Sequence, residues 1–458
     1  MKASDPLLAE AFGILEAIAA RGRLAVIAGG AVRDGALGRA LSDADIATDM
    51  SLEELATLFT THAVGRSRQF ETVVVVRGGR VFEITRFRGG AGAVPPGEGA
   101  RSAAAVADLL RKDAAHRDFT INALLLDAGG RVLDFHGGLA DLRARLVRAV
   151  GEPTERFEED PARLMRAARF AACLDFAIEP RTEAAVRAMA PRLAGVAPER
   201  LGGEILKMAA AGGPALARGI ELLDGLGLLR TVLPEVADLQ GLEHPPDKHP
   251  EGGVWEHTLA AVRSSASTDP GVNLAVLLHD IGKRPTHALV DGRPTYHGHE
   301  AAGAALAEGI ARRLALPQRL REALVFAIDN HRRAAKLDEM RRSKRLALVT
   351  HEHWPTLRAL SLCDRAARGD AEAVARRAAF FAEAERDAAA AGAAHRAGPV
   401  ISGTRIMELT GLAPGPRVGT IQRQVTEWAL DGRIEEQGRI EAEALRLAAP
   451  SAQGGTSP

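Results

Sequence analysis

The pattern of apolar and polar positions divides the chain into an early part with short strand-like segments and a longer part with helical periodicity. In the early part, apolar runs rich in β-branched residues stand between Gly and Asp residues, which is typical of strands. After about residue 155 the apolar positions recur every three or four residues, which predicts amphipathic helices. We expect strands at residues 24–28, 46–48, 72–77, 81–87 and 124–127.

This change of pattern predicts an α+β protein, with a small mixed β-sheet near the N-terminus followed by helices. Gly78 and Gly79 lie between two of the expected strands and favour a hairpin turn. Residues 89–104 are rich in Gly, Ala and Pro and predict a loop. A second loop is expected at residues 242–253, between two helical blocks, and a late helix is expected to start near Thr420.

The composition is that of a globular protein, because 46% of the residues are hydrophobic and 26% are charged. No apolar run approaches the length of about 18 residues needed to cross a membrane, and the first residues lack the features of a signal peptide. Cys173 and Cys363 are too few for a disulfide framework, so we expect a reducing cytoplasm. The formal net charge is zero, which argues against a strongly basic protein but permits a local basic surface.

The segment from Gly29 to Asp49 carries the strongest indication of chemistry. A Gly-Gly pair leads into an expected helix, and Asp43 and Asp45 follow two residues apart. Glycine lets a backbone approach a phosphate closely. Alternate residues of a strand point to the same face, so both carboxylates can hold divalent cations such as Mg²⁺, which prefers oxygen ligands. This combination predicts a site for nucleotidyl transfer.

With Gly-Gly-Ala-Val-Arg-Asp at 29–34 and Asp-Ala-Asp-Ile-Ala-Thr at 43–48, the chain resembles the class II nucleotidyltransferases. These are the bacterial CCA-adding tRNA nucleotidyltransferases and their poly(A) polymerase relatives. Further segments similar to this family follow in its order at residues 82–88, 116–123, 159–163 and 199–204. The resemblance implies Mg²⁺-dependent addition of C, C and A to the 3′ end of tRNA from CTP and ATP, with release of pyrophosphate. It implies neither a membrane nor DNA as a partner.

The resemblance also implies a role for each residue of these motifs. Asp43 and Asp45 would be the catalytic metal ligands, and the other positions would bind the nucleotide. These positions are Gly29, Gly30 and Arg33 at the triphosphate, Arg117, Asp118 and Asn122 at the ribose, Asp160 and Arg163 at the base, and Arg166 and Arg169 at phosphates. The spacing of three between Asp160 and Arg163 predicts one helical face, although spacing alone favours an ordinary surface ion pair. Glu83 is either a third acidic ligand or the partner of a neck arginine.

A second group of residues, in the helical part, resembles the HD superfamily of helical metal-dependent phosphohydrolases. His257 comes first, the adjacent pair His279-Asp280 follows, and Asp364 comes last, in the order of that superfamily. Neighbouring positions on a helix point about 100° apart, so one ion between helices can use both members of the pair. Imidazole and carboxylate together suit a transition metal such as Ni²⁺, Mn²⁺, Fe²⁺ or Zn²⁺.

Two more histidines extend this second group. His299 and His331 stand where some relatives add ligands for a second ion, and Lys283 could neutralise a phosphate. The resemblance leaves the role of the domain open between two alternatives. It either hydrolyses a phosphoester, for instance a 2′,3′-cyclic phosphate at a damaged RNA end, or serves as a metal-stabilised platform for RNA.

These motifs predict four parts of the chain. They are a nucleotidyltransferase head, or palm, at residues 1–148, a helical neck with the nucleotide-selecting helix at 149–215, an HD domain at 216–400 and a C-terminal tail at 401–450. The tail is expected either to contact RNA or to pack on the HD domain.

Three alternative functions share most of these motifs. They are a bacterial poly(A) polymerase, a half-enzyme that adds only CC or only A, and an HD phosphohydrolase with a nucleotide-binding head. The Phe-x-Thr-Val pattern at residues 70–73 looks more like the tRNA enzymes, and the complete pair of Asp43 and Asp45 argues against the third alternative. In the family, loop flexibility governs the switch from C to A, so residues 89–104 bear on the half-enzyme alternative.

Overall fold

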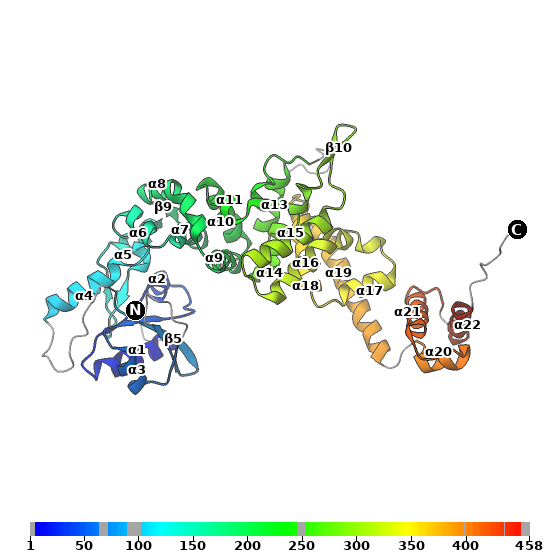
Figure 1. Cartoon of the computed structure of the whole chain (residues 1–458), viewed down its shortest axis with the longest axis horizontal. Helices are drawn as coiled ribbons and strands as arrows, with labels where there is room; N and C mark the ends of the chain where they lie inside the picture. The colour runs from blue at the N-terminus through cyan, green and yellow to red at the C-terminus, as the bar shows by residue number, and fades with distance from the viewer. Residues whose placement is uncertain are drawn as a thin grey trace. The chain divides into compact units, whose positions relative to one another are not determined.

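The computed structural model describes residues 5–63, 72–88, 102–244, 252–396, 400–434 and 436–449, and it divides into two compact units (Figure 1). The first unit is Met1–Ala211 with Arg218–Pro234, and the second is Gly212–Ala217 with Glu235–Pro458. The expected neck boundary at 215 falls inside the helix α10 (Gly213–Gly225). Most of the expected loops at 89–104 and 242–253, and Phe70 of the Phe-x-Thr-Val pattern, lie outside the described residues.

A seven-stranded mixed sheet forms the centre of the first unit. Its order is β3-β4-β5-β2-β1-β6-β7, and β2 and β5 are its only parallel pair among the described strands. The strands are β1 (Ala25–Ala28), β2 (Asp45–Thr48), β3 (Thr61–Ala63), β4 (Thr72–Arg77), β5 (Arg80–Arg86), β6 (Leu125–Leu126) and β7 (Val132–Leu133). The five expected strands are confirmed to within two residues at each end. The short edge strands β3 and β7 were not expected, because neither has an alternating apolar pattern.

Helices cover the sheet and fix its central strands. All four residues of β1 are buried, as expected for a strand covered on both faces. Val26 and Ala28 of β1 pack with Leu110 and Ala114 of α4. The helical elements of this part are α1 (Pro6–Ala19), α2 (Gly30–Ala36), α3 (Leu52–Leu58), α4 (Ala103–Ala115), the 3₁₀ turn η1 (Thr120–Asn122) and α5 (Gly138–Ala144).

The rest of the first unit is a helical segment in which α7 is the central, largely buried helix. Its elements are β8 (Leu146–Val147), α6 (Pro153–Glu159), α7 (Ala162–Leu174), β9 (Ala177–Ile178), α8 (Pro180–Met189), η2 (Ala190–Gly195), α9 (Pro198–Ala210), α10 and α11 (Leu229–Val232). α7 packs against α9. The parallel pair β8–β9 was not expected, because strands of two residues leave no periodic signal.

In its described residues the second unit is helical apart from one hairpin. Its elements are α12 (Pro234–Ala237), α13 (Val254–Arg263), α14 (Pro270–Leu278), η3 (Ile281–Lys283), β10 (Ala288–Val290), β11 (Arg293–Thr295), α15 (His299–Arg313), α16 (Gln318–Ala335), η4 (Leu337–Glu339), α17 (Arg342–Val349), α18 (Trp354–Ala366), α19 (Ala371–Arg396), α20 (Gly403–Thr410), α21 (Pro416–Leu430) and α22 (Gln437–Ala448). The buried helix α14 packs against α13, α16 and α18. No helix of the described ranges combines the length and apolarity needed to cross a bilayer.

Two local signals explain where this unit departs from expectation. The hairpin β10–β11 turns at Asp291-Gly292, both with positive φ, and this dipeptide is the preferred one for a two-residue hairpin. The helix expected from Thr420 begins at Pro416 instead, because proline is well suited to the first position of a helix. The last three helices share a core of their own around Ile406 and Val425.

Candidate functional site

Two glycines and two carboxylates meet where β1 ends and β2 begins. Gly29 follows β1 with a φ of 74° and caps α2. The antiparallel register places Ala28 opposite Asp45, the first residue of β2. Asp43 lies two residues before the strand, so the expectation that both carboxylates alternate within one strand is wrong. They remain close to the glycines, since a Cβ atom on Gly30 would stand 3.9 Å from Oδ1 of Asp43.

A third carboxylate belongs to this group. β5 runs parallel to β2 with Ile84 beside Ile46, so Glu83 stands beside Asp45 on the neighbouring strand. Burial, followed by the negative charges of Asp43 and Glu83, raises the pKa of Asp45 to about 6. Crowded carboxylates of this kind fit a bound divalent cation, which removes the repulsion between them. The geometry favours Glu83 as a third acidic ligand over a partner of a neck arginine.

A cavity of about 630 Å³ opens beside these carboxylates, a volume in the range of small-molecule sites. All twelve residues that the sequence assigned to catalysis and nucleotide binding line it: Gly29, Gly30, Arg33, Asp43, Asp45, Arg117, Asp118, Asn122, Asp160, Arg163, Arg166 and Arg169. The cavity also includes Arg88, Phe170, Arg200 and Lys207, to which the sequence gave no role in nucleotide binding. An acidic corner therefore faces a wall of guanidinium groups.

Asp118 holds part of this wall in place. Its carboxylate accepts hydrogen bonds from Arg166 Nε at 2.7 Å and from Asn122 Nδ2 at 3.0 Å. Asn122 Oδ1 in turn accepts a hydrogen bond from Arg33 at 2.7 Å. Burial opposes ionisation of Asp118, but Arg166 and the hydrogen bonds outweigh it and lower its pKa to about 2. Asp118 therefore positions the groups that were expected at the ribose and the phosphates.

Replacing Asp118 by Asn is expected to lower the free energy of unfolding at pH 7 by roughly 2–3 kcal/mol. A folded pKa below the unfolded value stabilises the native state above pH 4, and this contribution is lost as the pH falls through 2. The variant should therefore lose less stability than the wild type between pH 4 and pH 2. Urea unfolding at several pH values measures this. The matched control is Asp108→Asn, at an exposed carboxylate of α4, which should behave as wild type.

The two residues expected to read the base do not share a helical face. Asp160 ends α6 with extended backbone, and Arg163 is the second residue of α7. The intervening Pro161 disfavours helical backbone for the residue before it, which corrects the expectation from spacing. Asp160 accepts two hydrogen bonds from Arg200, at 2.8 and 2.7 Å. Although burial opposes it, Arg200 lowers the pKa of Asp160.

Arg163 is held mainly by the backbone. It donates hydrogen bonds to the carbonyls of Arg156 at 3.0 Å and His116 at 2.9 Å, and it pairs with Glu159. The protein itself therefore fixes the guanidinium at the edge of the cavity. The sequence marked residues 199–204 as a neck motif, but it gave no sign that Arg200 reaches Asp160.

The arginines expected at phosphates are gathered around one aromatic ring. Arg169 pairs with the buried Glu204 and lies 3.9 Å from the ring centroid of Phe170. Arg33 and Arg166 stand 5.1 and 5.2 Å from the same centroid. Cations are attracted to the face of an aromatic ring, so Phe170 helps to keep three like charges together. The apolar pattern of α7 marked Phe170 only as a core position.

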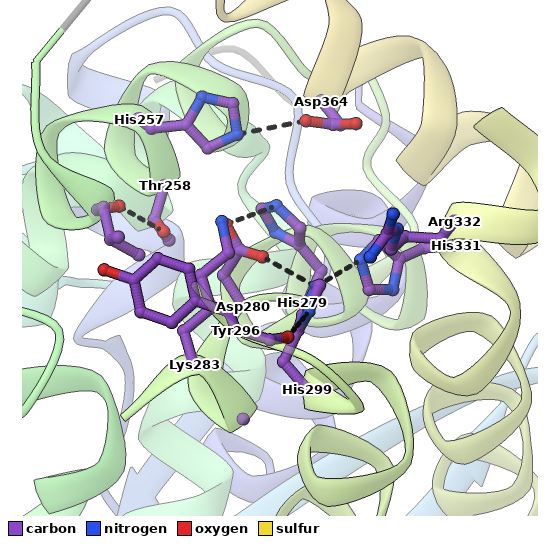
Figure 2. A network of polar contacts seen from close by, with 12 residues as sticks. His257, Thr258, His279, Asp280, Lys283, Tyr296, His299, His331, Arg332 and Asp364 are labelled. Atoms are coloured by element: carbon purple, nitrogen blue, oxygen red, sulfur yellow. Dashed lines mark hydrogen bonds and ion pairs between the residues drawn. The ribbon is translucent and has the colours of Figure 1, made fainter. Parts of the chain in front are cut away.

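The second constellation lies in the second unit, where four histidines and two aspartates converge (Figure 2). They form two groups of three residues, and within each group the ligand atoms lie within 4.8 Å of one another. The first group is His257, His279 and Asp364. The second group is Asp280, His299 and His331. The sequence placed Asp280 with the first ion; the structure brings its carboxylate to the two additional histidines and also keeps it 3.2 Å from His279 Nε2. His279 is the C-cap of α14 and Asp280 is the N-cap of η3, so the two ligands lie where one helical element ends and the next begins.

The histidines of this site are oriented as metal ligands. The Nδ1 atoms of His279, His299 and His331 lie 2.7, 2.8 and 2.6 Å from the backbone carbonyl three residues earlier. A carbonyl only accepts hydrogen bonds, so Nδ1 carries the proton and Nε2 faces the site, as in proteins that bind metals through Nε2. His299 Nε2 and His331 Nε2 stand 3.2 Å apart.

The charges of this site also fit a bound cation. Burial and the neighbouring His279 lower the pKa of His331 to about 4, and burial lowers that of His299. Both rings are therefore neutral near pH 7, and the facing Nε2 atoms are both acceptors, an arrangement that a metal ion satisfies. Despite burial, His279 and Lys283 hold the pKa of Asp280 well below its usual value. Lys283 donates to Asp280 at 2.6 Å.

Comparison with known proteins bears on both constellations. Residues 25–148 match the poly A polymerase head domain, residues 175–239 the probable RNA and SrmB-binding site of polymerase A, and residues 254–369 the HD domain. The A-adding tRNA nucleotidyltransferase of Deinococcus radiodurans is 38% identical over 338 residues, covering 71% of this chain and 76% of that protein. The Multifunctional CCA protein of Halorhodospira halophila is 39% identical over 239 residues, 51% of this chain and 56% of that protein.

A solved structure matches over nearly the whole length. The Bacillus stearothermophilus CCA-adding enzyme in complex with CTP superposes with a TM-score of 0.68 at 27% identity, covering 97% of this chain and 98% of that one. The matched length spans the head, the helical segment beyond it and the second unit, so the architecture expected from the sequence is confirmed.

Proposed function

Because this chain belongs to the tRNA nucleotidyltransferase family, which includes A-adding and CCA-adding enzymes, we propose that it adds C, C and A to the 3′ end of tRNA from CTP and ATP. Pyrophosphate is the second product. The observation that carries the proposal is the cavity in which Asp43 and Asp45 face a wall of arginines, with the charge of Glu83 acting on Asp45 from the neighbouring strand. A cytoplasmic location is part of the proposal.

In this proposal, Asp43, Asp45 and Glu83 hold Mg²⁺, which supplies charge neutralisation for the attacking hydroxyl and the leaving pyrophosphate. The residues of the chain position the reactants. Gly30 leaves space for a phosphate beside Asp43, and Arg33 offers its guanidinium to the triphosphate. Positioning and charge neutralisation are what phosphoryl-type transfer requires of a protein.

Replacing Asp160 by Ala is expected to lower kcat/KM for both CTP and ATP by about 100-fold, because the base loses a charged hydrogen-bond acceptor. Discrimination against UTP and GTP should fall at the same time. Competition assays with pairs of nucleotides measure the ratio of kcat/KM values. Glu155→Ala, at an exposed position of α6, is the matched control. Unchanged discrimination in the Asp160 variant would remove this residue from base selection.

The proposed function is tested with tRNA that lacks its 3′ end, supplied with CTP alone, ATP alone or both. Addition of CC from CTP and of one A after ATP supports the proposal. If the chain adds only A, and only to tRNA ending in CC, the proposal of full CCA addition would be replaced by A addition, the activity named for the Deinococcus radiodurans relative. A long ladder of A residues would identify a poly(A) polymerase, and no incorporation at all would overturn the assignment to transfer.

A second candidate function is metal-dependent hydrolysis of a phosphoester by the second unit. The observation that favours it is the set of six ligands with histidine Nε2 atoms aimed at one another, which suits a transition metal. Lys283 lies beside Asp280, where its ammonium group can meet a phosphate. Each group offers three protein ligands, which leaves coordination positions on a bound ion for water or substrate. A metal ion that only stabilises an RNA-binding platform would not require such positions.

A further inference from the structure

A second cavity, of about 340 Å³, lies between the C-terminal end of α16, α18 and α19. It shares no residue with the nucleotidyl-transfer cavity or with the two metal-ligand groups. Its lining includes one acidic residue, Asp338, and several small or aliphatic residues, but most of its polar and aromatic side chains are of two kinds. Three are guanidinium groups, from Arg365, Arg376 and Arg377, and two are the phenyl rings of Phe380 and Phe381.

Arg377 provides the fixed part of this cavity. Its guanidinium donates to Ser361 Oγ at 3.1 Å and to the carbonyl of Ala335 at 3.0 Å. Within the described ranges it makes no ion pair with a carboxylate. Burial lowers the pKa of Arg377; the charges of Asp364 and Asp338 oppose this shift, and the charge of Arg365 adds to it. Three arginines and one acidic residue, Asp338, line the cavity, so its lining has a net positive charge that an anion would relieve.

The other two arginines are free to turn toward a ligand. Arg365 and Asp370 are 3.4 Å apart, and Arg376 and Glu372 are 3.3 Å apart. The second pair is well exposed, with 65% and 87% of the two side chains accessible. Exposed ion pairs of this kind contribute little, so exchanging a carboxylate for a phosphate costs little. Arginine binds phosphate oxygens in a fork geometry that suits this exchange.

The aromatic side of the cavity complements the charged side. Phe380 is half-buried, and the guanidinium of Arg345 stands 5.7 Å from its ring centroid. Phe381 is fully buried and packs edge-on against Trp354, with centroids 5.2 Å apart. Bases of nucleotides stack on aromatic rings and on guanidinium planes. A volume of 340 Å³ lies at the small end of ligand sites, which fits one mononucleotide.

We propose that this cavity binds a nucleoside monophosphate, with its phosphate on Arg365, Arg376 and Arg377 and its base against Phe380. The site is separate from the transfer reaction, so it does not depend on the function proposed above. Arg365 directly follows Asp364 on α18, which places a bound phosphate next to a helix that also carries a candidate metal ligand.

The test is a titration of the full chain with AMP, followed by the fluorescence of Trp354. This residue reports on the cavity through Phe381, and a Trp354→Phe variant shows how much of the signal it carries. Wild-type protein should give a saturable change, and Arg376→Glu should weaken AMP binding by about tenfold or more. Arg376 is exposed, so this substitution leaves the fold intact. Arg386→Glu, on the exposed face of the same helix outside the cavity, should bind as wild type.

Two further probes separate the parts of the proposal. Adenosine and inorganic phosphate should each bind at least tenfold more weakly than AMP, because each lacks one half of the interactions. Equal binding of phosphate and AMP would overturn the assignment to a nucleotide. No saturable Trp354 signal with AMP, or the same affinity in Arg376→Glu and wild type, would overturn the site altogether.

Discussion

Replacing Asp45 by Ala is expected to lower the rate of nucleotide incorporation by about 1000-fold or more. Asp45 is the carboxylate with the raised pKa, between Asp43 and Glu83, and without it the remaining two carboxylates have no partner to complete a shared cation site. The loss concerns the chemical step, because the arginines that line the cavity stay in place. Binding of tRNA and of nucleotide should therefore change far less than the rate.

Single-turnover incorporation of labelled ATP into tRNA ending in CC measures this rate directly, and filter binding measures the affinity for the tRNA. Asp108→Ala, at an exposed carboxylate of α4 outside the cavity, is the control for removal of an acidic residue from the head. If Asp45→Ala retained a tenth of the wild-type rate, the paired carboxylates would not be the catalytic metal ligands. The same experiment on Glu83→Gln then decides whether the third carboxylate shares this role.

The sequence predicted those parts of the head whose signal is local. Strands such as β4 and β5 have apolar and β-branched runs with a Gly-Gly turn between them, and their predicted bounds agree closely with the structure. The site could be predicted because its motifs are short, for instance Gly29-Gly30 and the pair of Asp43 and Asp45. A strand of two or three residues has too few positions to show a period, so β3, β7, β8 and β9 were not expected.

The missing parts of the site depend on contacts between residues far apart in the chain. Arg200 reaches Asp160 across 40 positions, and Glu204 reaches Arg169 across 35. No spacing rule connects such residues, because their proximity follows from the packing of α7 against α9. The same holds for Phe170, whose position in the apolar pattern of α7 suggested only a core residue. Sequence motifs therefore identified residues that line the cavity, whereas packing supplied the residues that hold them.

One error came from treating spacing as sufficient. Asp160 and Arg163 are three residues apart, which is a helical spacing, yet Pro161 stands between them. Proline restricts the residue before it to extended backbone, and Asp160 adopts that conformation. The helix boundary was thus readable from the sequence. The position of Asp280 between His279 and His299 was not, because it depends on how α14 ends and on where α15 begins.

Replacing Asp280 by Asn is expected to remove bound transition metal from the second unit and to lower metal-dependent phosphoester hydrolysis at least about 100-fold. Asp280 is buried, accepts a hydrogen bond from Lys283 at 2.6 Å, and lies 3.2 Å from His279 Nε2 and 3.7 Å from His299 Nε2. It is thus the carboxylate that adjoins both ligand groups. Asparagine keeps its size but not its charge, so Lys283 remains packed while the cation sites lose their shared anion.

Two measurements on the purified full chain check this expectation. Elemental analysis after loading with Ni²⁺ or Mn²⁺ gives the metal content per chain. The hydrolytic rate is measured with a 2′,3′-cyclic nucleotide: the chain opens the cyclic phosphate, and an added phosphatase then releases the resulting monoester as phosphate for detection. Asp329→Asn, at an exposed position of α16 two residues before His331, is the matched control.

Nucleotide incorporation by Asp280→Asn should equal that of the wild type, because the two sites share no residue. A wild-type chain that binds metal but hydrolyses no phosphoester would leave the second unit as a metal-stabilised platform, and unchanged metal content in the variant would remove Asp280 from the ligands.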